Sequence, residues 1–171
     1  ESVMNQTGES GFHFTDEAMP PRLLKDVALE IKRRKMVVSY WGNIRFDKTY
    51  TAELCELLSE SGMIAASGGL EVASDRLLKL MRKGVTIEQT TLACKHLTDA
   101  GIMVHTYLMY GFPTETFQEC IDALEVVRQL FANGLVHSAF WHRYAMTVHS
   151  PSGQNPKDFG VDKAKCACNS F

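Results

Sequence analysis

The feature that most constrains the fold is the alternation of strand-like and helix-like segments along a chain of 171 residues. The strand-like segments are short and apolar, and the segments between them carry apolar residues at helical spacing. The predicted strands are 11–15, 36–41, 63–69, 102–111 and 135–142. Alternation with short connections indicates parallel strands joined by right-handed helical crossovers.

Each predicted helix has a residue typical of a helix start or of a helix stop. The start signals are a proline pair, a serine cap and two capping boxes, in which a Thr is followed three residues later by Gln or Glu. They are Pro20-Pro21, Ser74, Thr86 with Gln89, and Thr116 with Glu119. The stop signals are Gly62, Gly84, Gly101 and Gly134. We predict an α/β domain over residues 1–150 and an irregular C-terminal tail over 151–171.

The number of predicted strands limits which α/β architectures the chain can form. Five strands are too few to close an ordinary eight-stranded barrel. No strong glycine fingerprint for a dinucleotide follows the first predicted strand. The chain is therefore expected to be an open twisted sheet or a partial parallel (β/α) barrel with helices on its outer face. In both architectures ligands bind at the carboxyl ends of the strands.

Polar, charged and glycine residues gather directly after the predicted strands. After the first three strands these residues are Asp16, Glu17, Asn43, Arg45, Asp47, Gly68, Gly69, Glu71 and Ser74. Near the last two they are Tyr110, Gly111, Pro113, Thr114, Glu115, His142, Arg143, Tyr144 and His149. Structural explanations remain open for them, such as charges at a helix N-terminus or a surface ion pair. If they are functional, they converge on one rim.

Composition and charge favour a cytoplasmic protein without a nucleic-acid or membrane partner. The net charge is −2, and the single basic run, 32–35, closes a predicted helix. No apolar stretch approaches the roughly 20 residues needed to span a bilayer. Five cysteines form no secreted disulfide pattern, and Cys166-x-Cys168 is a weak metal motif in the tail. The chain begins with Glu1, and we expect it to be a piece of a longer protein.

Several segments together resemble the radical S-adenosylmethionine (radical SAM) superfamily, in particular the branch found with cobalamin-binding domains. They are FHFTDEAMPP (12–21), WGNIRFD (41–47), GGLEVASDRLLKLMRKGVT (68–86), AGIMVHTYLMYGFPTET (100–116) and WHRYAMTVHSP (141–151). The likeness covers about residues 11–151. It implies that SAM binds along the carboxyl rim of a partial barrel.

The resemblance also implies a role for each matched position at the methionyl end of SAM. Asp16 and Glu17 stand where the family binds the methionyl amino group, although the family's GGE triplet is TDE here. Arg45 is placed to meet the methionyl carboxylate, which a guanidinium can bind bidentately.

At the nucleoside end, the resemblance implies that Glu71 accepts hydrogen bonds from the ribose hydroxyls, with Ser74 nearby. Met109, Tyr110 and Gly111 would then pass the adenine. The residues around the last strand, His142, Arg143, Tyr144 and His149, are the candidates for substrate contacts.

The family's defining CxxxCxxC loop, which holds a [4Fe–4S] cluster, is absent from this sequence. The resemblance therefore implies a piece of an enzyme that reductively cleaves SAM to a 5′-deoxyadenosyl radical. Its substrate is a small molecule or another, unknown compound, and a cobalamin domain elsewhere in the protein is a further expectation. By itself the chain is expected to be inactive.

Two other interpretations remain open: a non-catalytic α/β binding domain that lost the cluster, and a hydrolase using Asp16, Glu71 and histidines around a metal. A CxxxCxxC motif within about 60 residues before Glu1 would favour the radical enzyme over the binding domain. The missing strands also predict an unpaired edge at 11–15, covered by the tail or by a second copy of the chain.

Overall fold

The computed structural model describes residues 1–161 and confirms the α/β fold class. Five parallel strands form one sheet in sequence order, as expected for a partial barrel. The strands are β1 (Gly11–Phe14), β2 (Ser39–Asn43), β3 (Met63–Glu71), β4 (Met103–Tyr110) and β5 (Ser138–Arg143). Within residues 1–161, β1 and β5 are the edges of the sheet.

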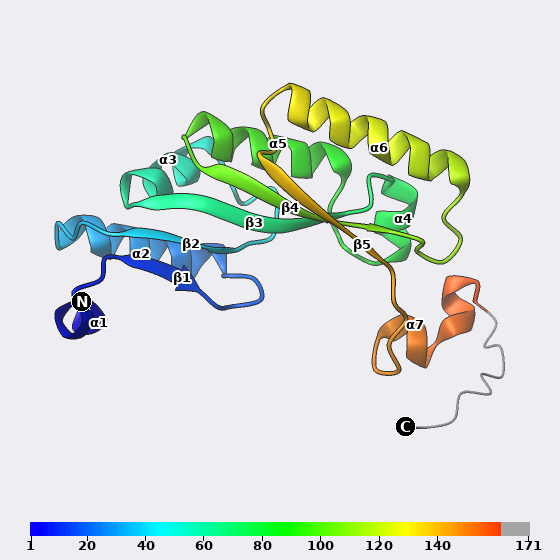
Figure 1. Ribbon diagram of the computed structural model, residues 1–171, viewed down its shortest axis with the longest axis horizontal. Coiled ribbons are helices and arrows are strands. Elements are labelled where there is room, and N and C mark those ends of the chain that lie inside the picture. The colour runs from blue at the N-terminus through cyan, green and yellow to red at the C-terminus, as the bar shows by residue number, and fades with distance from the viewer. Residues whose placement is uncertain (162–171) are drawn as a thin grey trace.

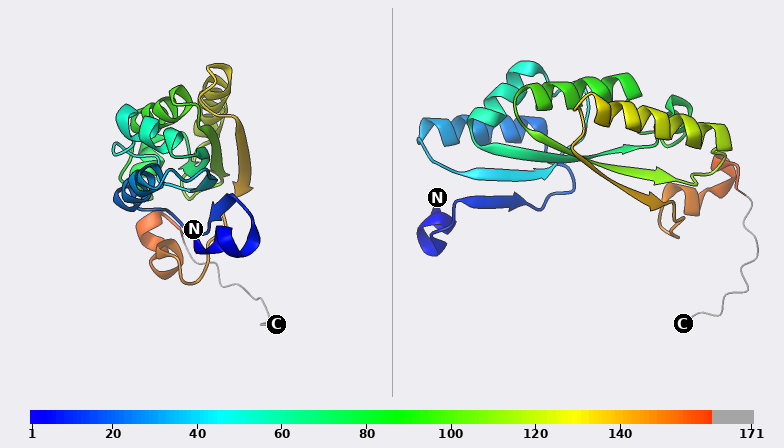
Figure 2. Two further views of the ribbon diagram at one scale, coloured as in Figure 1. Left: turned by 90° about the vertical axis from the view of Figure 1, so that its left-hand side faces the viewer. Right: turned by 45° about the horizontal axis from the view of Figure 1, so that its top comes forward.

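The helices that connect the strands lie along one face of the sheet. The elements are α1 (Ser2–Thr7), α2 (Pro21–Arg33), α3 (Ala52–Glu60), α4 (Asp75–Leu80), α5 (Ile87–Asp99), α6 (Phe117–Ala132), α7 (Pro151–Gln154) and the 3-10 helix η1 (Pro156–Phe159). Figure 1 shows α3, α5 and α6 above the sheet, and Figure 2 shows how strongly the sheet twists. We call the opposite face the inner face, because it corresponds to the interior of a (β/α) barrel.

The main core lies between the sheet and these helices. Alternate strand residues such as Tyr40, Ala66 and Val104 are buried against helix residues such as Leu58 and Leu97. Because successive strand residues point to opposite faces, the residues between them lie on the inner face. The alternation of side chains along each strand therefore separates an outer face packed on the helices from an inner face that a ligand can reach.

The caps predicted from sequence are confirmed. Both capping boxes form, Thr86 with Gln89 and Thr116 with Glu119, and the Ser74 hydroxyl accepts the backbone N–H of Leu77 at the start of α4. These caps fix where α4, α5 and α6 begin, so the loops that precede them have defined ends.

Three local predictions were incomplete. The second strand begins at Ser39 rather than at residue 36, because α2 ends in a turn in which Lys35 has φ 52 and the Met36 N–H donates to the Ile31 carbonyl. The N-terminal helix α1 was not predicted. The part of the predicted irregular tail that the structure describes forms α7 and η1.

This described part of the tail is packed onto the domain. Phe159 is 6% exposed and belongs to a second apolar cluster with Val72, Leu77, Leu78 and Phe112. The cluster lies beyond the carboxyl ends of β3 and β4, so η1 supports the loops that carry the candidate site. No helix within residues 1–161 has the length and apolar character needed to cross a membrane.

Candidate functional site

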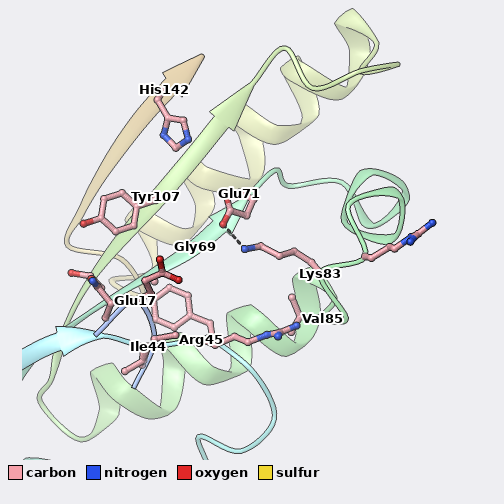
Figure 3. Close-up of a pocket in the computed structure, with 15 residues that line it drawn as sticks. Glu17, Ile44, Arg45, Gly69, Glu71, Lys83, Val85, Tyr107 and His142 are labelled. Atoms are coloured by element: carbon pink, nitrogen blue, oxygen red, sulfur yellow. Dashed lines mark ion pairs between the residues drawn. The ribbon is translucent and has the colours of Figure 1, made fainter. Parts of the chain in front are cut away.

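A pocket of about 660 Å³ opens at the carboxyl ends of the strands. Strands β2, β3, β4 and β5 each contribute residues, and the loop after β1 supplies Glu17. The lining is Glu17, Ala18, Asn43, Ile44, Arg45, Phe46, Ser67, Gly68, Gly69, Glu71, Arg82, Lys83, Val85, Tyr107 and His142. Figure 3 shows Glu17, Glu71, Tyr107 and His142 from separate segments around one space. The position agrees with the rule that ligands of parallel α/β folds bind at strand carboxyl ends.

The centre of the pocket wall is the end of β3. Ser67, Gly68 and Gly69 are small, and other side chains pack directly against the two glycines. A Cβ added at Gly68 would overlap the Phe46 ring, and one added at Gly69 would overlap the Glu71 carboxylate, so glycine is needed at both positions. Beyond them the pairing of β3 with β4 shifts register between Gly69 and Glu71. A bulge of this kind re-aims the following side chain, here that of Glu71.

Glu71 adopts an unusual backbone conformation, with φ 62 at a residue that is not glycine. Such conformations cost free energy and cluster at functional sites. The Glu71 carboxylate forms an ion pair with Lys83, with Oε1 and Nζ 2.6 Å apart. The strained backbone therefore directs a charged group into the pocket wall.

The pocket carries charges of both signs. Glu17 and Glu71 are the carboxylates, and Arg45, Arg82 and Lys83 are the cations. Arg45 comes from the loop after β2 and reaches toward the loop after α4, where a Cβ added at Gly84 would lie 3.3 Å from its Nη2. These carboxylate acceptors and cationic donors together suit a ligand that is itself zwitterionic and has hydroxyl groups.

A hydrogen-bonded clasp joins the loop after β3 to the loop after β4. Arg76 donates to both carboxylate oxygens of Glu119, at 2.8 and 2.7 Å, and to the Thr114 carbonyl at 2.8 Å. Ser74 donates to Glu119 at 2.9 Å. Hydrogen bonds from Arg76, foremost, and from the Thr116 backbone hold the pKa of Glu119 well below its usual range.

The clasp gives Ser74 a structural task. Its hydroxyl both caps α4 and donates to Glu119, and it does not line the pocket. Its predicted contact with the ribose therefore stays a prediction. Thr114, which has φ 67, is likewise held by Arg76. Sequence reasoning assigned neither Arg76 nor Glu119 to the rim, because nothing local marks an ion pair between distant helices.

The residues predicted to pass the adenine do not line the pocket. Tyr110 faces a separate apolar pocket with Cys120 and Leu124 of α6, and Met109 packs against the second apolar cluster. Gly111 has φ 79, and its N–H donates to the Glu115 carboxylate. Tyr107, which was not predicted, is the residue of β4 that lines the pocket.

Of the other predicted site residues, some line the pocket and some do not. His142 lines the pocket, and Arg143 is exposed on the next position of β5. Tyr144 packs edge-to-face on Phe112 and hydrogen-bonds to Ser152. Asp16 and His149 are exposed and lie outside the lining. The pocket therefore brings together Glu17, Arg45, Glu71 and His142 from the predicted set.

The described cysteines do not form a cluster site. Cys55 and Cys94 are buried in the core on α3 and α5, and burial raises the pKa of each thiol to about 12. Iron–sulfur ligands are thiolates, so these two thiols do not fit. Among residues 1–161, no three His, Cys, Asp or Glu side chains lie together as metal ligands. Cys166 and Cys168 lie outside the described residues.

Arg82 and Lys83 were also missed by sequence reasoning, although the segment MRKG that contains them was noted. Both follow α4, and Arg82 has φ 56. A long side chain after a tight turn can reach back across a pocket, but the sequence does not show which direction it takes. Tyr107 could have been found from strand alternation, since it faces opposite to the buried Leu108.

Residues 7–127 match the sequence model of the family described as the Radical SAM superfamily. An uncharacterized methyltransferase of Pyrococcus horikoshii is 28% identical over 105 residues, which are 61% of this chain and 23% of the relative. A tRNA-2-methylthio-N(6)-dimethylallyladenosine synthase of Thermotoga petrophila is 24% identical over 115 residues, 65% of this chain and 24% of the relative.

Solved structures show the same fold. The radical S-adenosylmethionine methyltransferase TsrM of Kitasatospora setae, with cobalamin and a [4Fe-4S] cluster bound, superposes with a TM-score of 0.74 at 17% identity, over 88% of this chain and 31% of that one. The cobalamin-dependent S-adenosylmethionine radical enzyme OxsB gives 0.64 at 14% identity, over 92% and 24%. The chain spans less than a third of the length of each of these proteins.

Proposed function

Because the chain belongs to the radical SAM superfamily, we propose that it forms the SAM-contacting rim of a larger enzyme that reductively cleaves SAM to a 5′-deoxyadenosyl radical. The [4Fe–4S] cluster of that enzyme supplies the electron and is held by residues outside 1–161. The chain alone is inactive in this proposal. The substrate is unidentified, and a cobalamin domain elsewhere in the protein is part of the proposal.

The chemistry of the pocket supports SAM as the ligand. SAM has an amino group, a carboxylate, a sulfonium, ribose hydroxyls and an adenine. Glu17 suits the amino group, and Arg45 suits the carboxylate because a guanidinium binds carboxylates bidentately. A volume of about 660 Å³ lies in the usual range for small-molecule sites.

The observation that carries the proposal is the geometry of Glu71. It combines a strained backbone, a bulge that ends β3 and a position in the pocket wall. A carboxylate can accept two hydrogen bonds from neighbouring ribose hydroxyls. In this role Glu71, whose carboxylate lies over Gly69, binds and orients the nucleoside.

The second candidate is a non-catalytic α/β binding domain that keeps the pocket and lacks the cluster. The described part of the chain carries the pocket that both candidates need. The two candidates differ in what lies outside this chain, so the test must use the longer protein. For a metal-dependent hydrolase, no group of three His, Cys, Asp or Glu side chains that could hold the metal lies within the part of the chain described by the structure.

The decisive experiment is anaerobic reconstitution of the full-length protein with iron and sulfide, followed by reduction in the presence of SAM. We expect a brown protein with a cluster absorption band and release of 5′-deoxyadenosine. The Glu71→Gln variant should take up the same iron and release less 5′-deoxyadenosine. Absence of a cluster under these conditions would establish the non-catalytic candidate instead.

A further inference from the structure

Residues with a strained backbone gather around the second apolar cluster. Within residues 1–161, four residues other than glycine have a positive φ, and three of them are Glu71, Arg82 and Thr114. They lie at the end of β3, after α4 and after β4, each within two residues of a member of the cluster or of a side chain packed against it. Such conformations persist only where the surrounding structure holds them in place. The packing of this cluster therefore matters for the shape of the rim.

One side of the cluster is formed by residues 151–160, which we call the C-terminal strap and which contain α7 and η1. Phe159, the last residue of η1, is 6% exposed. Its ring packs edge-to-face on that of Phe112, with the ring centroids 6.2 Å apart. Val72 is buried in the same cluster. One side chain of the strap thus packs together with buried residues of the loops after β3 and after β4.

The strap also meets two of the strained residues directly. A Cβ added at Gly160 would lie 2.8 Å from Cγ2 of Thr114, so the strap backbone is packed closely on Thr114. Arg76 donates hydrogen bonds to the hydroxyl and the carbonyl of Thr114, so this residue is held from two sides. Phe159 and Arg82 line one hollow of about 360 Å³ beside α4. The strap and the clasp therefore support the same part of the rim.

We propose that Phe159 is a positioning residue, which holds Glu71 in its left-handed conformation by completing the cluster in which Val72 is buried. Val72 directly follows Glu71 and is 1% exposed. A return of Glu71 to negative φ would redirect the chain and pull Val72 out of the cluster, so the burial of Val72 opposes it. Without the Phe159 ring the cluster would be open on one side, and this opposition would weaken.

The consequence for the pocket is a carboxylate that is held in one place. In the left-handed conformation Glu71 lies in the pocket wall and pairs with Lys83. Relaxation of the backbone would turn the carboxylate away and remove this acceptor from the ligand. No residue of the strap lines the pocket, so Phe159 acts on binding only through Glu71. That the affected ligand is a nucleoside rests on the proposed function; the effect of Phe159 on Glu71 does not.

The test follows the backbone of Glu71 by NMR in the isotopically labelled chain. A residue with positive φ has its amide and α protons close together and gives a strong nuclear Overhauser effect (NOE) between them. We expect this strong NOE at Glu71 in the unchanged chain, its loss in Phe159→Ala and its return in Phe159→Leu, which restores most of the apolar volume. Phe159→Val, a smaller deletion, gives the same comparison at a lower cost in stability. A strong NOE retained in both the Ala and the Val variant would overturn the proposal.

The matched control is Val127→Ala on α6. Val127 is also 6% exposed but belongs to the main core between the sheet and the helices. This deletion should lower the free energy of unfolding and leave the NOE at Glu71 unchanged. The same loss of the NOE in Val127→Ala and in Phe159→Ala would mean that any core deletion releases Glu71, and Phe159 would then have no specific role.

Titration with adenosine connects the strap to the pocket. Phe159→Ala should weaken adenosine binding about tenfold, which is the loss expected for removing the charged acceptor of Glu71. In a chain that already carries Glu71→Gln, the same substitution should cause no further loss, because the two residues act through one another. Independent, additive losses would show that Phe159 acts on the pocket without Glu71 and would overturn the proposal.

The two measurements separate the strap from the proposed function. If the unchanged chain binds no adenosine and the reconstituted longer protein releases no 5′-deoxyadenosine, the proposed function is refuted. Loss of the NOE in Phe159→Ala would then still establish that the strap holds Glu71. A retained NOE with normal adenosine binding refutes the strap and leaves the proposed function standing.

Discussion

The Lys83 ammonium lies 2.6 Å from Oε1 of Glu71 and neutralises the one carboxylate that the backbone holds in a strained conformation at the pocket wall. The side chain of Glu71 is 17% exposed and that of Lys83 is 39% exposed. Lys83 is thus the more solvent-accessible partner. A nucleoside that hydrogen-bonds to Glu71 must share the carboxylate with Lys83 or displace it.

This relationship predicts opposite effects of two substitutions on adenosine binding to the chain. Glu71→Gln removes the charged acceptor and should weaken adenosine binding about tenfold, because hydrogen bonds to charged groups are the stronger ones. Lys83→Met keeps the chain length, removes the competitor and should leave binding unchanged or strengthen it. NMR titration with adenosine, which has no carboxylate, measures both.

The matched control is Glu56→Gln, on the exposed side of α3 and outside the pocket lining. It should leave adenosine binding unchanged. If Lys83→Met weakens binding as much as Glu71→Gln does, Lys83 itself contacts the nucleoside and the competition is ruled out.

Much of the fold could be predicted because its determinants are local. The capping boxes at Thr86 and Thr116 and the glycine at 62 act within one turn of chain, so the sequence reveals them. The start of β2 was misplaced because Lys35, not a glycine, adopts the left-handed conformation that ends α2. Nothing in the residue type indicates that conformation.

The site was only partly predictable, and for two different reasons. Met109 and Tyr110 are neighbours on one strand and point to opposite faces, so their contact with adenine stays a prediction, whereas strand alternation alone could have added Tyr107 to the pocket lining. The contacts of Lys83 and Arg76 are different in kind. They depend on where long side chains meet residues 12 and 43 positions away in sequence, which only the tertiary structure determines.

The Arg76–Glu119 clasp predicts a pH-dependent stability. The folded pKa of Glu119 is lowered, chiefly by Arg76, below an unfolded value of about 4.3. Its contribution is therefore fully present above the unfolded pKa and is lost as the pH falls toward the folded pKa. Glu119→Gln should lower the free energy of unfolding by about 1–2 kcal/mol at pH 7, and by less at pH 3.5.

Urea denaturation at the two pH values measures this difference. Glu125→Gln is the matched control, since Glu125 pairs with Arg128 on the same helix but both side chains are exposed. Solvent screening should make its effect at pH 7 clearly smaller. Equal losses for the two variants would mean that the clasp adds nothing to an ordinary surface pair.

Two glycines with positive φ should respond differently to alanine. Gly111 has φ 79 and nothing within 4 Å of an added Cβ, so Gly111→Ala should cost only the left-handed backbone penalty of about 1–2 kcal/mol. Gly62 has φ 104, and its added Cβ would overlap the Val38 carbonyl oxygen. Gly62→Ala should therefore cost about 3 kcal/mol or more. Chemical denaturation compares them, and a Gly62→Ala loss no greater than that of Gly111→Ala would contradict the overlap.

Two buried tyrosines provide a test of hydrogen-bond satisfaction in the core. The Tyr40 hydroxyl pairs with Ser61 Oγ at 2.7 Å, whereas the Tyr50 hydroxyl is buried without a partner among residues 1–161. Tyr40→Phe should lower the free energy of unfolding by about 1 kcal/mol, because it removes the hydrogen bond between the Tyr40 hydroxyl and the buried Ser61 Oγ. Tyr50→Phe removes an unsatisfied polar group and should leave stability unchanged or raise it by up to about 1 kcal/mol.

Thermal and urea unfolding of the two Phe variants gives both values, and each variant serves as the control for the other because both tyrosines are 1% exposed. Burial raises the pKa of Tyr50, since the charged form loses its hydration there. The hydroxyl therefore remains protonated, and titration adds nothing to the comparison near neutral pH. A loss for Tyr50→Phe equal to that of Tyr40→Phe would show that the Tyr50 hydroxyl has a hydrogen-bond partner in solution.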